Sequence, residues 1–417
     1  MARWLLTWLV LLSALPTLAG SVTLLRVEGG IDPAVAEYVQ TGLRYAGDRG
    51  DALVVIEMDT PGGLSTSMES IVKAILASRA PVCVYVAPSG ARAASAGAII
   101  ALAANFVAMA PATNIGAATP IAGISGSDLD RKIKNDAAAK ARALAALRGR
   151  PVDLAQRVVL RAESITVDEA VRQGLCDVKA NELTDVLRHL DGRKANGRVL
   201  HLSDASVDVN EMPLRLAILH LLANANVAYI LMLVAIYGII AELSHPGAVF
   251  PGVTGAIAAL LAFYAFSVLT VNVTGLLLIA LAIGLFIGDL SVAAHGSLAV
   301  GGAVAFVIGS LMLFRGPLGG VSPYLVSGCT VLTVAFFVGF LSLALRTRHR
   351  PAAVGREAMV GCIGVTRSEL APDHPGRVLF EGALWTARSA TAIPRGQTVE
   401  VVAVNGLTLT VRPDQRV

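Results

Sequence analysis

The chain has 417 residues, which is enough for two or three domains. Only 15% of the residues are charged and the mean hydropathy is +0.66, so a wholly soluble protein is excluded and membrane spans are expected. The formal net charge of +4 is too small to indicate nucleic-acid binding, and the four cysteines lack the C-x-x-C spacing of a zinc site.

The first twenty residues have the pattern of a secretory signal peptide. Arg3 precedes an apolar run, Trp4–Leu15, and small residues follow up to Gly20. We expect cleavage near Ala19 or Gly20, with an uncleaved membrane anchor as the alternative. In both cases the following domain is exported.

Residues 21–200 predict an α/β domain with a largely parallel, buried sheet, because continuous apolar runs alternate with helical patterns. The expected strands are Val22–Val27, Leu53–Met58, Val82–Val86 and Phe106–Met109, and the expected helices span about 33–47, 65–78, 95–104 and 130–148. Ligand sites in such sheets gather at the carboxyl ends of the strands, which makes 59–63 and 88–97 candidate site loops. Cys83 and Cys176 form either a disulfide or two buried thiols.

The second of these loops contains a candidate nucleophile, Ser95, in the run Ala94-Ser95-Ala96-Gly97. Its small neighbours let another backbone approach closely, and an apolar helix that begins there would stabilise developing negative charge. On this stretch alone, an ordinary helix cap is the better interpretation. The first loop contains Gly62 and Gly63, whose N–H groups could form an oxyanion hole or belong to an ordinary turn.

The chemistry of a general base for Ser95 points to lysine. All seven histidines lie at position 189 or beyond, which excludes a Ser-His-Asp triad built within this domain, and arginine stays protonated. A desolvated lysine can lose its proton near neutral pH. Lys132 and Lys134 begin the expected 130–148 helix and point to nearly opposite faces, so their spacing does not choose between them. Two solvated surface charges are the alternative.

An ordered series of motifs resembles the NfeD family of ClpP-class membrane serine proteases, the Ser-Lys peptidases paired with stomatin-like proteins. The matching segments are Asp59–Gly63, Ala94–Gly97, Ala108–Pro111, Asn114–Ala117, Lys132–Asp136, Leu147–Arg150 and Glu169–Ala170 with Gly174. The resemblance implies a ClpP/crotonase-like fold in which Ser95 is the nucleophile and Lys132 the general base. It assigns the oxyanion hole to the Gly62-Gly63 backbone and the Ala96 N–H. It also implies a mobile loop at 123–130, so that the dyad assembles on substrate binding.

Beyond the α/β domain we expect a linker with an interfacial segment at 201–223 and an α-helical membrane domain at 224–345. Five apolar stretches, at about 226–242, 247–269, 273–290, 296–314 and 323–345, are long enough, or nearly so, to cross a bilayer. The arginines that follow the last span place the C-terminus in the cytoplasm and the α/β domain outside. Glu242 and Asp289 near span ends are read as interfacial acids in preference to functional ones.

The tail, 346–417, returns to a soluble composition and predicts a small all-β domain. Five short strands are expected at about 357–366, 376–381, 383–388, 397–404 and 407–412. The resembling family has an OB-fold there. Nucleic acid is not an expected ligand because no row of stacking aromatics is present. A protein partner or the anionic inner leaflet fits this basic tail better.

These patterns predict a membrane-anchored serine endopeptidase without cofactor or metal, which cleaves peptides with apolar residues. The resemblance implies a stomatin- or prohibitin-like membrane partner, a role in membrane protein quality control and a homo-oligomeric assembly. The alternative is a non-catalytic membrane scaffold that organises such a partner. A crotonase-type acyl-CoA enzyme shares the general fold, but the export signal counts against it because that cofactor is intracellular.

Overall fold

The structure is a computed structural model that describes residues 20–414, apart from 121–127, 245–246, 248, 292–295, 315, 317 and 349–358. The predicted signal peptide therefore lies outside the described residues except for Gly20. The chain divides into two compact units, Met1–Val331 and Leu332–Val417. Each unit is described by itself below.

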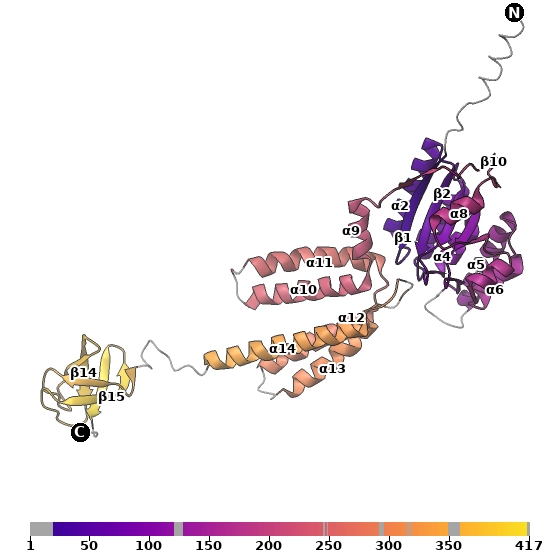
Figure 1. The fold of residues 1–417 in the computed structure, drawn as a ribbon. Coiled ribbons are helices and arrows are strands. Elements are labelled where there is room, and N and C mark those ends of the chain that lie inside the picture. Colours follow the sequence, from indigo (N-terminus) through magenta and orange to yellow (C-terminus); the bar gives the residue numbers. More distant parts are fainter. Residues whose placement is uncertain are drawn as a thin grey trace, which may run out of the picture. The chain divides into compact units, whose positions relative to one another are not determined.

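The first unit begins with an α/β domain built on a six-stranded parallel sheet (Figure 1). The strand order is β11-β1-β2-β3-β5-β8. The strands are β1 (Ser21–Glu28), β2 (Leu53–Asp59), β3 (Val82–Val86), β5 (Phe106–Met109), β8 (Val178–Lys179) and β11 (Ser206–Val209). The first four confirm the predicted strands to within a residue or two. Because neighbouring strands are parallel, the loops after β2 and β3 leave the sheet at the same edge.

Helices and a second, smaller sheet complete this domain. The helices are α2 (Pro33–Arg49), α3 (Ser65–Leu76), α4 (Ala96–Ala103), α5 (Asp128–Leu147), α6 (Val152–Leu160), α7 (Val167–Arg172) and α8 (Leu183–Leu190). The smaller sheet has the order β4-β6-β7 and consists of β4 (Arg92–Ala94), β6 (Asn114–Gly116) and β7 (Ser164–Thr166). A short hairpin pairs β9 (Lys194–Ala195) with β10 (Arg198–Val199).

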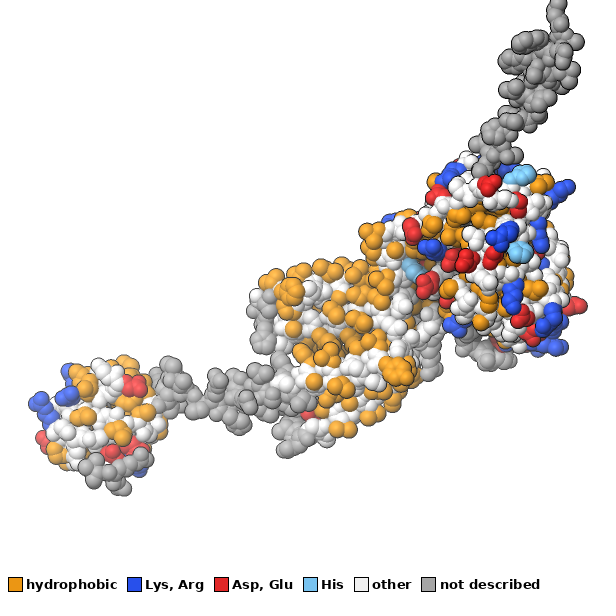
Figure 2. Space-filling model, in the orientation of Figure 1, with side chains coloured by type: hydrophobic (Ala, Val, Ile, Leu, Met, Phe, Trp, Pro, Cys, Tyr) orange, Lys and Arg blue, Asp and Glu red, His pale blue; other side chains and the backbone are white. Residues whose placement is uncertain are grey.

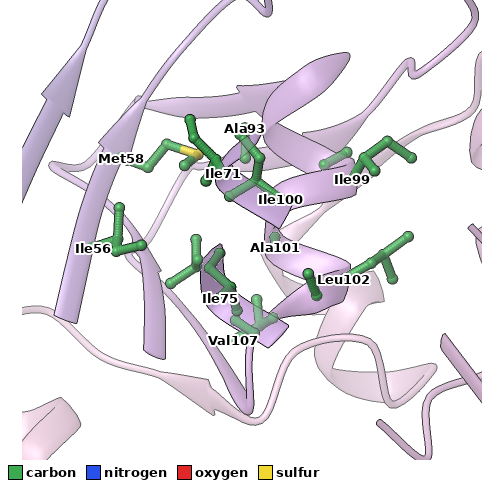
Figure 3. Close-up of a cluster of buried hydrophobic side chains, with 14 of the residues drawn as sticks. Ile56, Met58, Ile71, Ile75, Ala93, Ile99, Ile100, Ala101, Leu102 and Val107 are labelled. Atoms are coloured by element: carbon green, nitrogen blue, oxygen red, sulfur yellow. The ribbon is translucent and has the colours of Figure 1, made fainter. Parts of the chain in front are cut away.

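Two apolar clusters lie on opposite faces of the main sheet because alternate residues of a strand point to opposite sides. On β2, Ile56 and Met58 belong to the larger cluster and Val55 to the smaller one. Figure 3 shows Ile56 and Met58 facing side chains of α3 and α4, among them Ile71 and Ile100. Every residue of α4 is buried, so the helix that begins after Ser95 is held on all sides.

The segment expected as a linker, 201–223, differs from that expectation. Residues Ser206–Val209 form β11, which pairs in parallel with β1 at the edge of the main sheet. Helix α9 (Leu214–Leu222) packs on α2, and its Leu216 is part of the larger core cluster. The polar residues of β11 hid this edge strand. The apolar stretch of α9 was expected as the interfacial segment, and the structure adds that its Leu216 is buried in the α/β core.

Five apolar helices follow at the five expected stretches: α10 (Ala225–Ser244), α11 (Phe250–Val268), α12 (Val273–Ser291), α13 (Ser297–Met312) and α14 (Pro323–Arg348). Among the described residues, α10 and α11 are long and apolar enough to cross a membrane, and the apolar parts of the other three are shorter. Figure 2 shows hydrophobic side chains gathered over these helices and charged side chains over the α/β domain. An apolar exterior of this kind is suited to lipid.

Glycines bring these helices together in two hairpins, α10 with α11 and α12 with α13. A Cβ on Gly238 would lie 2.8 Å from the Gly255 Cα, and one on Gly309 would lie 2.8 Å from the Gly275 carbonyl oxygen. This is the small-residue packing typical of membrane helices. Glu242 and Asp289 lie near the ends of α10 and α12, and each has a buried carboxylate oxygen without a hydrogen-bond partner among the described residues.

The second unit contains a closed five-stranded barrel of order β12-β13-β14-β16-β15. Its strands are β12 (Ile363–Thr366), β13 (Gly376–Phe380), β14 (Ala383–Ser389), β15 (Thr398–Asn405) and β16 (Thr408–Pro413). Neighbouring strands are antiparallel except β14 and β16, which are parallel. Small apolar residues and Phe380 fill the barrel interior. A five-stranded closed barrel with this order confirms the predicted all-β domain.

Candidate functional site

The two candidate loops lie side by side because the chain after β2 pairs with β4. Thr60 forms a parallel bridge with Ala93. Its N–H donates to the Arg92 carbonyl oxygen at 2.7 Å, and its carbonyl oxygen accepts the Ala94 N–H at 3.0 Å. The Asp59 carboxylate accepts the Arg92 N–H at 3.0 Å. These bonds place the Gly62-Gly63 turn directly beside the residue that follows β4.

That residue is Ser95, which lies at a sharp turn between β4 and α4. Its backbone has φ 53° and ψ −113°, a conformation that residues with a side chain rarely adopt. The Ser95 N–H donates to the Gly116 carbonyl oxygen at 2.8 Å, and this bond holds the turn. Strained backbone of this kind gathers at functional sites, where the surrounding structure has to maintain it.

The small residues around Ser95 are required because the loop after β2 and the turn after β4 approach each other closely. A Cβ on Gly62, which has φ +118°, would lie 2.7 Å from the Ser95 Cβ. A Cβ on Gly97 would lie 2.5 Å from the Thr60 Cγ2 atom. Contacts under 3.0 Å essentially never occur for real Cβ atoms. The glycines that the sequence pattern singled out therefore allow the two loops to touch.

The candidate oxyanion donors differ in their availability. The Gly62 N–H is taken up by the Thr60 hydroxyl at 3.0 Å. The Gly62 carbonyl oxygen accepts the Ile31 N–H at 2.8 Å, and the trans peptide therefore points the Gly63 N–H away from Ile31. Within the described part of the chain, neither the Gly63 N–H nor the Ala96 N–H, at the first position of α4, has an acceptor.

A pocket of about 130 Å³ opens beside Ser95. Most of its lining is apolar, with charged groups at three positions. The lining residues are Gly63, Ser65, Met68, Glu69, Ser95, Ala96, Ile99, Ala118, Pro120, Ile133, Asp136, Ala137 and Lys140. A concave apolar space next to a hydroxyl and unpaired N–H groups is suited to an apolar side chain whose neighbouring carbonyl carbon is attacked.

The lysines at the start of α5 do not line this pocket. Lys132 is exposed, and Lys134 forms an ion pair with Asp130 at 2.9 Å. The residues of α5 that line the pocket are Ile133, Asp136, Ala137 and Lys140, whereas Lys132, one turn before Asp136 on the same side of the helix, does not line it. The predicted loop 123–130 lies outside the described residues up to 127. Ser95, Gly63 and Ala96 thus line one pocket, and the exposed Lys132 does not line it.

The sequence analysis gave no site role to the three charged residues of the pocket, Glu69, Asp136 and Lys140. Lys140 lines the pocket from α5 and donates to the Glu69 carboxylate of α3 at 2.6 Å. The Lys140 ammonium holds the pKa of Glu69 below its usual range, mainly through this hydrogen bond. Its spacing of seven residues from Ile133 could have indicated the same helix face. The described residues contain no group of three or more side chains that could hold a metal ion.

Two further expectations have an outcome in the α/β domain. Cys83 and Cys176 are free buried thiols in the structure, which is the second of the two alternatives. Burial raises the pKa of the Cys176 thiol to about 12, so it is unsuited to act as a nucleophile near neutral pH. The two cysteines of this domain are therefore poorer candidates for the nucleophile than Ser95.

Comparison with known proteins gives a consistent picture over the whole chain. The NfeD1b N-terminal domain matches residues 21–196, the NfeD integral membrane domain matches 226–345, and the NfeD-like C-terminal, partner-binding domain matches 356–413. The membrane-bound protease PH1510 of Pyrococcus horikoshii is 34% identical over 437 residues, covering 99% of this chain and 98% of that protein. The membrane protein NfeD1b of Bacillus subtilis is 26% identical, covering 94% and 92%.

Solved structures match the α/β domain. A mutant of the 1510-N membrane-bound stomatin-specific protease, in complex with a substrate peptide, is 30% identical to this chain. The match covers 48% of this chain and 95% of that one, with a TM-score of 0.44. Since the match to PH1510 extends over nearly all of both proteins, and three NfeD models follow one another along the sequence, the chain belongs to the NfeD family, as its motifs predicted.

Proposed function

We propose that this protein is a membrane-anchored serine endopeptidase in which Ser95 is the nucleophile. The observation that carries the proposal is the strained Ser95 turn, which lines an apolar pocket together with Gly63 and Ala96, whose N–H groups have no acceptor among the described residues. An acyl-transfer site needs a hydroxyl, an oxyanion hole and a space for the neighbouring side chain, and these are the parts that meet here. Homology to a membrane-bound protease supports the same activity.

The proposed base is Lys132. In the reaction, neutral Lys132 takes the proton of the Ser95 hydroxyl while the oxygen attacks the peptide carbonyl carbon. The Gly63 and Ala96 N–H groups bind the oxyanion, and the lysinium then gives its proton to the departing amine. Water attacks the acyl-enzyme by the same route and frees Ser95. Because Lys132 is exposed in the structure, this proposal requires the start of α5 to turn or shift when substrate binds.

Gly62 has a different proposed role from the one expected. Its N–H is bound to the Thr60 hydroxyl, so we assign the donor role to Gly63 and Ala96. Gly62 then contributes by its carbonyl oxygen, which fixes the orientation of the Gly63 peptide through Ile31. Gly62 also has no side chain that would clash with Ser95.

The substrate and partner are proposed from the pocket and from the family. The pocket favours an apolar side chain, and the relative PH1510-type protease is described as stomatin-specific. We propose that substrates are apolar segments of membrane-associated proteins, with a stomatin- or prohibitin-like partner held by the C-terminal barrel. The α/β domain then lies on the outer face of the cell membrane and the barrel in the cytoplasm, and the role is membrane protein quality control.

The test is a fluorophosphonate probe applied to the full chain in lipid nanodiscs, followed by peptide mapping. We expect stoichiometric labelling on Ser95 and none in a Ser95→Ala variant with the same circular dichroism spectrum. Cleavage of a fluorogenic peptide with apolar residues should disappear in the same variant. A folded wild-type chain that is neither labelled nor active would overturn the proposal and favour a non-catalytic scaffold.

A further inference from the structure

A hydrogen-bonded pair outside the pocket, His220 and Asp32, connects the helix that leads into the membrane region with the Gly62-Gly63 loop. His220 lies on α9, two residues before the end of that helix and five before the start of α10 at Ala225. Its Nδ1 atom lies 2.5 Å from an Asp32 carboxylate oxygen, and its Nε2 atom lies 3.1 Å from the Glu28 carbonyl oxygen. The sequence analysis had left this histidine without a role.

Both ring nitrogens of His220 therefore face acceptors, and only the doubly protonated ring can donate to both. The Asp32 carboxylate is buried and accepts the Val35 N–H on its other oxygen, at 2.9 Å. The hydrogen bond from His220 to Asp32, opposed by partial burial, raises the pKa of the His220 imidazole above its usual range. The charged ring thus fits this position better than the neutral one.

Asp32 follows the residue that holds the Gly62-Gly63 loop. The Ile31 N–H donates to the Gly62 carbonyl oxygen at 2.8 Å, and the Leu64 N–H donates to the Ile31 carbonyl oxygen at 2.9 Å. A Cβ on Gly63 would lie 2.3 Å from that Ile31 oxygen, so the two backbones are in close contact. Any shift of residues 31–32 therefore has to reorient the Gly62-Gly63 peptide.

We propose that His220 is a positioning residue for the reaction: it pins Asp32, and through Ile31 it aims the Gly63 N–H at the oxyanion. The proposal rests on the proposed protease function of Ser95. It makes the oxyanion hole depend on the seating of α9, the helix from which the chain enters the membrane region. Loss of the ring charge removes one of the two hydrogen bonds and loosens this arrangement.

Other titratable groups near this pair are few among the described residues. The Glu28 carboxylate at the end of β1 also favours the charged ring, and the Tyr264 phenol of α11 interacts electrostatically with Asp32. Arg215 of α9 is paired with Glu37 of α2. His220 is thus the cation that faces Asp32 in this part of the chain.

The sign of the pH dependence follows from the raised pKa. Below about pH 6.5, the ordinary histidine value, both hydrogen bonds are present, and one of them is lost as the pH rises through the higher folded value. We expect wild-type kcat to exceed that of His220→Asn by about five- to tenfold at low pH. The ratio should fall toward one at alkaline pH, with little change in KM. Taking the ratio at each pH cancels the titration of the lysine base.

The experiment measures fluorophosphonate labelling rates and peptide cleavage by the full chain in nanodiscs from pH 5 to pH 9. The variants are His220→Asn, which keeps an amide N–H donor group without a charge, and His220→Ala. His189→Asn is the matched control, because His189 is exposed on α8 and, within the described part of the chain, its ring is hydrogen-bonded to the Asp185 carbonyl oxygen of the same helix. Circular dichroism checks folding.

The outcomes are separable. A pH-dependent ratio for the His220 variants with a flat ratio for His189→Asn supports the proposal. If wild type reacts at Ser95 and the His220 variants match it at every pH, this inference is overturned while the protease function stands. If wild type does not react at any pH, the protease function falls, and the positioning role falls with it.

Discussion

Ser95 and Lys132, the two members of the proposed catalytic pair, are held very differently. Ser95 lies between a paired strand and a helix buried at every residue, and its N–H is bonded to Gly116. Lys132 is exposed in the polar first half of α5. The difference indicates that the proposed nucleophile and oxyanion donors are preorganised, whereas the proposed base has to move toward them.

The physical reason lies in what each segment buries. The α4 side chains sit in the main core, so moving Ser95 would expose apolar surface (Figure 3). The first turns of α5 bury little, and Lys134 is held by Asp130 through an ion pair in which both groups belong to the same helix. Most of the described residues in those turns are exposed or half-buried, and such regions open at low free-energy cost.

The largest expected effect is from Ser95→Ala. Labelling and cleavage should fall by about 10³-fold or more, because the covalent step is lost and only binding and the oxyanion hole remain. The free energy of unfolding should change little, since Ser95 Oγ has no hydrogen-bond partner among the described residues. The measurement is single-turnover cleavage with a parallel thermal unfolding curve. Residual activity close to wild type would assign the nucleophile elsewhere.

Replacing the lysines tests the delivery of the base. Lys132→Ala should lower kcat by about 10²- to 10⁴-fold, the usual contribution of a general base. Lys134→Ala is the matched control on the same helix and should retain most activity, since it removes only a partly exposed ion pair. If Lys132→Ala remains fully active and Lys134→Ala does not, the assignment of the base is wrong.

Gly62→Ala tests whether the site is preorganised by close contact. The new Cβ would lie 2.7 Å from the Ser95 Cβ at a φ of +118°, so the loop has to move. We expect a loss of about 1–3 kcal/mol in the free energy of unfolding and a slower labelling rate. Gly149→Ala, at φ +67° in open space, should cost about 1–2 kcal/mol through backbone strain alone and leave labelling unchanged. Equal labelling rates in both variants would contradict the proposed contact.

The smallest effect is expected at the Lys140–Glu69 pair. Its side chains are 33% and 43% exposed, so solvent weakens the interaction to a few tenths of a kcal/mol. Because the pKa of Glu69 is lowered, its contribution is present above the ordinary glutamate value and is lost as the pH falls through the lowered one. The Lys140→Ala variant should therefore have a slightly lower unfolding temperature than wild type at pH 7 and the same unfolding temperature at pH 3. Circular dichroism melts of the full chain would show this.

The order of domains and most element boundaries could be predicted from the sequence. Buried parallel strands such as Val82–Val86 are continuous apolar runs, and α10 and α11 are long apolar helices, so local composition is sufficient to locate them. The predicted linker was partly wrong, because its pairing with the α/β domain depends on distant segments and not on local composition. β11 and α9 join the α/β domain through contacts with β1 and α2, which lie about 180 residues earlier in the chain.

The sequence by itself determined which side chains are available to the site: a serine among small residues, two adjacent glycines after a strand, and several lysines. It also showed that the α/β domain has no histidine before position 189. Only the tertiary structure decided which of these meet. The Gly62 N–H is bonded to the Thr60 hydroxyl, whereas the Gly63 N–H has no acceptor among the described residues. Lys140 lines the pocket and Lys132 does not, and Asp32 connects His220 to Ile31. The Lys140 and His220 relations depend on side-chain hydrogen bonds between segments far apart in the chain, and the Gly62 relation on a local bond to the Thr60 hydroxyl. Neither periodicity nor spacing records such bonds.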